Sequence, residues 1–143
     1  MTKLSELKAA ETKFKTEVQA KIKANKGGDT WVKVQAIADR VPAALSSPIA
    51  SIELMHNSKD PKDKLKIPGY FKTLRTQFNA IDLAPVNTYI KEHGEGGSKT
   101  RGLLSTAKAK QDEKARVALA GNLIKQFGLM QIMLNNMREQ ELF

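Results

Sequence analysis

The chain has 143 residues, of which 41% are hydrophobic and 27% charged, with 24 Lys and Arg against 15 Asp and Glu and a formal net charge of +9. It contains no cysteine, which excludes a disulfide framework and any cysteine-based metal site. No apolar run approaches the roughly 20 residues that cross a bilayer, and the first 15 residues are charged where a signal peptide is apolar. We therefore expect one domain, residues 1–143, that is cytoplasmic and spans no membrane.

The first segment predicts an amphipathic helix from about Lys3 to Lys26. Its apolar residues recur at spacings of three and four, within one arc of roughly 120°: Leu4, Leu7, Ala10, Phe14, Val18 and Ile22. Gly27 and Gly28 follow as a helix stop. Four lysines lie together beside the apolar arc: Lys8, Lys15, Lys23 and Lys26. This clustering of lysines is expected if the helix binds an anionic partner. It is also expected if the lysines simply lie at the rim of a buried face.

The next segment predicts two helices separated by a break. The first begins at Asp29 or Thr30, is anchored by Trp31, and ends at Pro42, because proline breaks a helix interior. The second begins at Ser47–Pro48, a start signal, and ends near His56. Residues 35–52 also resemble the residue pattern of a helix-turn-helix motif. The second helix, which would read the DNA, contains no Lys or Arg in this stretch. Residues 57–70, with two prolines, are predicted to be a loop.

Two shorter helices and a connector come next. Aromatic and aliphatic spacing predicts a helix from Pro68 to about Phe78, and Pro85 opens another that contains Tyr89. Four glycines in ten residues then predict a flexible connector at 94–102. Its sequence GEGGSKT is not a nucleotide-binding loop, because Ser98 stands where that motif needs glycine before the lysine.

The last segment, from about Ser105 to Leu142, predicts a long and strongly apolar helix. One stripe about 80° wide contains Leu119, Leu123, Phe127, Met130, Leu134 and Met137. Since apolar residues also occur elsewhere around this helix, the stripe is either the spine of the domain or a subunit interface. The fold class is therefore all-α, a compact bundle of about five to six helices with a long C-terminal helix.

The positive charge is concentrated in three blocks, residues 1–26, 58–75 and 99–116. If they converge in space, they form one basic face that attracts phosphates or an acidic protein. The candidate nucleic-acid-binding residues are Lys59, Lys62, Lys64, Lys66, Tyr70, Lys72, Arg75, Lys99, Arg101, Lys108, Lys110, Lys114 and Arg116. Tyr70 belongs to this set because an aromatic ring among cations can stack on a base.

No arrangement of residues predicts catalysis. The two histidines, His56 and His93, stand without a metal-ligand spacing, and no nucleophile has a base nearby in the sequence. We therefore expect no enzyme activity, no metal and no cofactor.

Two functions fit these patterns. The first is a non-enzymatic protein whose Lys-rich face makes sequence-tolerant contact with nucleic-acid phosphates, DNA or RNA. The second is an assembly module, a homo-oligomer or a binder of an acidic protein, organised by the apolar last helix.

Overall fold

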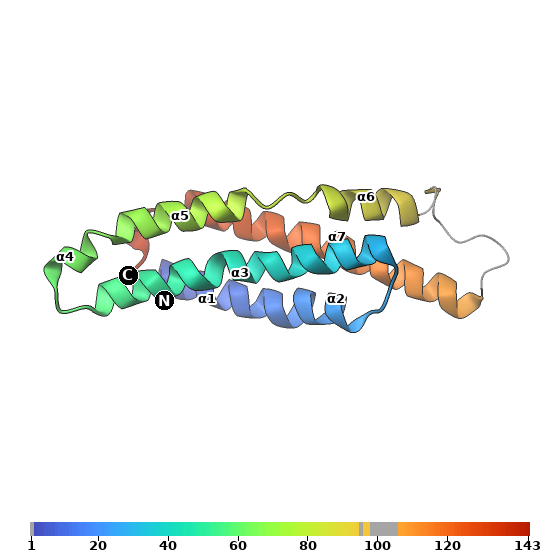
Figure 1. Cartoon of the computed structure of the whole chain (residues 1–143), viewed down its shortest axis with the longest axis horizontal. Helices are drawn as coiled ribbons and strands as arrows, with labels where there is room; N and C mark the ends of the chain where they lie inside the picture. The colour runs from blue at the N-terminus through green and yellow to red at the C-terminus, as the bar shows by residue number, and fades with distance from the viewer. Residues whose placement is uncertain (1, 95, 98–105) are drawn as a thin grey trace.

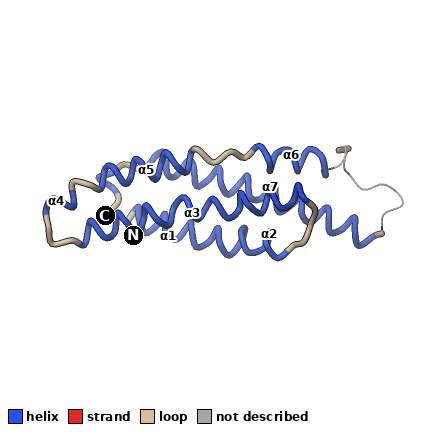
Figure 2. Tube along the Cα trace, in the orientation of Figure 1, coloured by secondary structure: helices blue, strands red, loops and turns tan. Residues whose placement is uncertain are grey.

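The structure is a computed structural model that describes residues 2–94, 96–97 and 106–143. Four helical rods run alternately up and down (Figures 1 and 2), and the described residues contain no strand. In chain order, the rods are α1, η1 and α2 (Lys3–Phe14, Lys15–Gln19, Ala20–Ala24); α3 (Asp29–Asn57); α5 with α6 (Ile67–Asn79, Ala84–His93); and α7 (Ala107–Asn136). The all-α class and the apolar C-terminal helix are confirmed, but the expected count of five to six helices is wrong, since the described residues form four helical rods.

The predicted break at Pro42 is the main error. Helix α3 is continuous for 29 residues and contains both Pro42 and Pro48, each of them buried. An interior proline costs about 3 kcal/mol of helix stability, whereas each large buried aliphatic side chain contributes roughly 1.5–3 kcal/mol. The buried stripe of α3 runs without a gap through both prolines: Trp31, Val34, Ala38, Val41, Leu45, Ile49 and Ile52. Packing along this stripe outweighs the local signal.

The first rod begins at Lys3 as predicted and ends at Ala24, two residues before the expected Lys26; its π-helical turn η1 was not predicted. The rod ends before Gly27, which is required there because a Cβ atom would lie 2.7 Å from the Trp31 side chain. Trp31 is fully buried, and its indole Nε1 donates a hydrogen bond to the carbonyl oxygen of Asn25 at 3.0 Å. The indole therefore anchors the turn into α3, as its position predicts.

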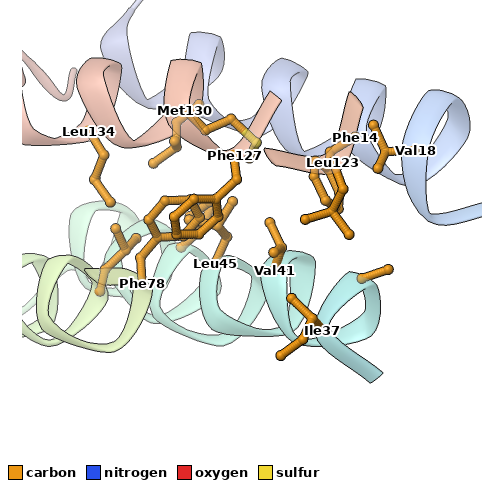
Figure 3. Packing of buried hydrophobic residues seen from close by; sticks show 14 of the residues in the cluster. Phe14, Val18, Ile37, Val41, Leu45, Phe78, Leu123, Phe127, Met130 and Leu134 are labelled. Atoms are coloured by element: carbon orange, nitrogen blue, oxygen red, sulfur yellow. The ribbon is translucent and has the colours of Figure 1, made fainter. Parts of the chain in front are cut away.

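The core lies between the four rods (Figure 3). Phe78 of α5 and Phe127 of α7 stack with their ring centroids 4.6 Å apart. The predicted stripe of α7 belongs to this core: Leu123, Phe127, Met130, Leu134 and Met137 are all buried, and Leu119 is partly buried against it. The stripe therefore packs mainly inside the bundle, although Met130 and Met137 also line openings at the surface.

The third rod is interrupted between α5 and α6, where the sequence predicts it. The carboxylate of Asp82 accepts a hydrogen bond from the Ala84 amide at 2.9 Å, and Pro85 follows in the first turn of α6. The short helix α4 (Pro61–Lys64) occupies part of the predicted 57–70 loop. Most of the predicted 94–102 connector lies outside the described residues.

Helix α7 ends at Asn136, six residues before the expected end, and the chain continues through η2 (Glu139–Glu141). It turns back because Leu142 is fully buried and its carbonyl oxygen accepts a hydrogen bond from the Leu4 amide at 3.1 Å. By length and composition, α7 is also long and apolar enough to cross a bilayer, with a mean hydropathy of 1.3 over its most apolar 18 residues. The core helix of a bundle passes the same test when it is mostly buried, whereas 28% of this apolar stretch is buried.

Candidate nucleic-acid interface

Of the three basic blocks, 58–75 and the described part of 99–116 lie at opposite ends of the bundle (Figure 1). The third, residues 1–26, forms the first rod between them, where Lys3, Lys8, Lys15 and Lys23 each have a carboxylate oxygen within 4.0 Å. Helix α4 and the start of α5 are at one end, whereas α7 begins at the other end and runs the length of the molecule. A 30-residue helix is about 45 Å long, several times the Debye length of about 8 Å at physiological salt. The expected single basic face does not form, so each end acts as a separate charged pole.

We define the α4–α5 pole by its exposed cations, which are Lys59, Lys62, Lys64, Lys72 and Arg138. Among the described residues, none of these five has a carboxylate oxygen within 4.0 Å. Arg138 was not among the predicted site residues, because it lies 63 positions from the block that it joins. Lys66 differs from the five, since its ammonium group is 3.2 Å from the carboxylate of Asp63.

Two carboxylates hold α4 in place. Asp60 caps the helix, with its Oδ1 accepting a hydrogen bond from the Lys62 amide at 2.9 Å. Asp63 accepts a hydrogen bond from the Ser58 hydroxyl at 2.6 Å. That bond, together with Lys66, lowers the pKa of the Asp63 carboxyl below its ordinary value. Asp63 therefore stays ionised and pairs with Lys66. The lysines that define the pole have no such pair among the described residues, so their ammonium groups can contact a ligand.

An open polar cleft of about 630 Å³ lies between α5 and the end of α7. We call it the α5–α7 cleft; its lining is Pro68, Phe71, Lys72, Arg75, Asn135, Asn136, Met137, Arg138, Glu139 and Gln140. Three cations therefore line this cleft against one carboxylate. Lys72 and Arg138 are exposed, and Asn136 adds an amide, whereas the Asn135 amide already exchanges hydrogen bonds with Asn79 at 2.8 and 3.3 Å. Such a lining suits an anion with several oxygen atoms, such as a phosphate.

Arg75 has a structural role that the sequence did not predict. Its Nη2 donates hydrogen bonds to the carbonyl oxygens of Leu134 at 3.3 Å and Met137 at 2.5 Å. The guanidinium also lies over the Phe71 ring, 4.6 Å from its centroid. Arg75 thus caps the carbonyl end of α7, where a cation opposes the helix dipole. It contributes positive charge to the cleft, but its Nη2 already donates to two carbonyl oxygens and its guanidinium stacks on Phe71.

The predicted base-stacking residue, Tyr70, is only partly available. Its ring is half-buried and packs against the core, while the adjacent Phe71 is buried under Arg75. Neither ring offers a full face to a base. The pole is therefore suited to backbone contact more than to base stacking.

The second basic pole lies at the start of α7. Lys108, Lys110 and Lys114 are exposed there, and none has a carboxylate oxygen within 4.0 Å among the described residues. Arg116 is half-buried: its Nε donates to the Tyr89 hydroxyl at 3.0 Å and its Nη1 to the Lys26 carbonyl oxygen at 3.1 Å. Arg116 therefore ties three rods together, contrary to its expected role as a phosphate ligand. Lys99 and Arg101 lie outside the described residues.

A partly buried polar network beside this pole was not predicted. The Thr30 hydroxyl lies 3.2 Å from His93 Nε2, and His93 Nδ1 lies 3.6 Å from the Glu113 carboxylate. The imidazole also stacks on Tyr89, with ring centroids 4.2 Å apart. These residues come from α3, α6 and α7, separated by 20 to 83 positions, so no sequence pattern brings them together. The side chains of Thr30, His93 and Glu113 thus form a chain of polar contacts that joins the three helices at this end of the bundle.

We expect the His93→Ala variant to lower the free energy of unfolding by about 1–3 kcal/mol, since it removes the ring stack on Tyr89 and the contact with the Thr30 hydroxyl. Urea denaturation followed by circular dichroism measures this change. Lys91→Ala, at an exposed residue of the same helix, is the control and should change stability by less than about 0.5 kcal/mol. Equal effects for the two variants would show that the network contributes nothing.

The described residues contain no group of three or more His, Asp or Glu side chains placed to hold a metal ion. Comparison of the chain with protein-family models, with curated proteins and with solved structures finds no match.

Proposed function

We propose that this protein is a non-enzymatic binding protein that contacts nucleic-acid phosphates through the α4–α5 pole without reading the base sequence. The observation that carries this proposal is the α5–α7 cleft, where Lys72, Arg75 and Arg138 stand against one carboxylate, that of Glu139. The cleft adjoins exposed lysines with no ion pair in the described part of the chain.

The kind of cation favours phosphate contact over base recognition. Four of the five residues that define the pole are lysines, whose ammonium groups act as point charges. Reading of guanine in the major groove prefers the two-pronged arginine fork, and the only exposed arginine of the pole is Arg138. We therefore expect affinity to depend on salt and length of the nucleic acid more than on its sequence.

Titration with labelled oligonucleotides at graded salt tests this proposal. If roughly three to five phosphates are neutralised, log affinity for duplex DNA should fall against log salt with a slope of about −2.7 to −4.5. Between 50 and 200 mM salt, the affinity should then fall by about 40-fold to 500-fold. Absence of binding to both duplexes and single strands at about 50 mM salt would overturn the proposal.

A further inference from the structure

Helix α7 leaves apolar side chains exposed on the side that faces away from the core. Ile132 is 61% exposed and Leu129 is 53% exposed. On the same helix, Gly121 and Gly128 have no atom within 4 Å of the point where a Cβ would stand. A bundle helix with one buried face ordinarily presents polar residues to solvent. The outer side of α7 instead places these apolar and glycine residues around a single described lysine, Lys125, which is exposed.

A groove runs alongside this surface, between the first rod and α7. It has a volume of about 180 Å³ and is lined mainly by apolar side chains: Ala10, Phe14 and Val18 from the first rod, and Leu129, Met130 and Met133 from α7. An engineered protein cavity of about 150 Å³ holds a benzene molecule, so this groove has room for one aliphatic side chain. Leu129 lines the groove, and Ile132 stands one helical turn from it. We call this combined surface the α1–α7 face.

The charges at the edge of the groove indicate what covers it. Lys13 and Glu17 line it one turn apart on the first rod, and both are exposed. In the described part of the chain, neither has an opposite charge within 4.0 Å. A partner or a membrane of uniform charge would attract one of these residues and repel the other. A two-fold axis through this edge instead places Lys13 of each copy against Glu17 of the other, so the pattern is self-complementary.

We propose that the α1–α7 face binds a second copy of this chain, forming a symmetric dimer. Ile132 of each copy enters the groove of the other, and two Lys13–Glu17 pairs close the edges. This inference does not rest on the proposed function, because the α1–α7 face contains none of the residues that define the α4–α5 pole. In the dimer, two basic poles belong to one particle, which raises avidity for a long polyanion.

Light scattering after gel filtration, over about 1–200 μM protein, tests the proposal. The mass should rise with concentration from that of one chain, 15.8 kDa, toward twice that value. The Ile132→Glu variant should remain monomeric, because it places a charge in the groove. Leu54→Glu is the matched control, since Leu54 is 66% exposed on α3 and should leave the dimer intact.

Charge variants distinguish a second copy from any other occupant. Lys13→Glu and Glu17→Lys each replace two attractive contacts with two repulsive ones, and each alone should weaken self-association about tenfold or more. Mixed together, the two variants should form a heterodimer, and the double variant K13E/E17K should recover the wild-type dimer. A wild-type chain that stays at 15.8 kDa up to 200 μM would overturn the proposal, whether or not it binds lipid vesicles.

Discussion

The triple variant K62E/K64E/K72E is expected to lose most of its affinity for nucleic acid, at least about 100-fold at 50 mM salt. Each reversal removes one cation that can neutralise a phosphate and adds a charge that repels it. The salt slope should fall by about 0.9 for each lost contact, or about 2.7 in total. Fluorescence anisotropy with a labelled duplex measures both quantities. All three side chains are exposed, so the fold should persist, which circular dichroism checks.

The matched control is K108E/K110E/K114E, which makes the same change in net charge at the other pole. Because Lys108, Lys110 and Lys114 lie roughly 33–42 Å from the end of α7, salt screens them from the α4–α5 pole. We expect a much smaller loss of affinity, below about tenfold. Equal losses in the two variants would contradict a site at α4 and α5, and would show that binding follows only the net charge of the protein.

Among the variants considered, Phe127→Ala, which truncates one ring of the central aromatic pair, is expected to lower the free energy of unfolding the most. Phe127 is 3% exposed and stacks on Phe78, so Phe127→Ala removes a buried ring and leaves a cavity. The free energy of unfolding should fall by about 3–5 kcal/mol, a large part of the total stability of a domain of this size. Urea denaturation monitored by tryptophan fluorescence measures the loss, since the single Trp31 is buried in the same core.

The control for this prediction is Leu54→Ala, which removes a side chain of similar hydrophobicity from an exposed position and should cost less than about 1 kcal/mol. A loss below about 1.5 kcal/mol for Phe127→Ala would contradict the position of α7 in the core. It would return the stripe of α7 to the role of an interface, the alternative that its sequence left open.

Periodicity in the sequence was enough to predict the fold class, the start of every long helix and most of the core. The predictions failed where a local signal competed with packing. A proline in the interior of a helix normally breaks it, but in α3 the buried stripe continues from Val41, before Pro42, to Leu45, after it. Read as one stripe from Trp31 to Ile52, the spacing alone supports a single helix.

The candidate site was harder to predict, because charge carries no periodicity that reveals which blocks meet in space. The blocks at 58–75 and 99–116 are equivalent in the sequence, yet the first block and the described part of the second, residues 106–116, lie at opposite ends of the bundle. Arg75 and Arg116 could not be told from ligand-binding cations, since the carbonyl and hydroxyl oxygens that occupy them come from distant segments. For the same reason, Arg138 and the His93 network were missed.

The hydrogen bond between Leu4 and Leu142 has a consequence for engineering this chain. It brings the two termini together at the end of the bundle that bears α4 (Figure 1). A linker of a few residues is therefore enough to join them into a closed loop. New ends placed between Ala80 and Leu83, where α5 and α6 are already separate, would give a circular permutant with all four rods intact.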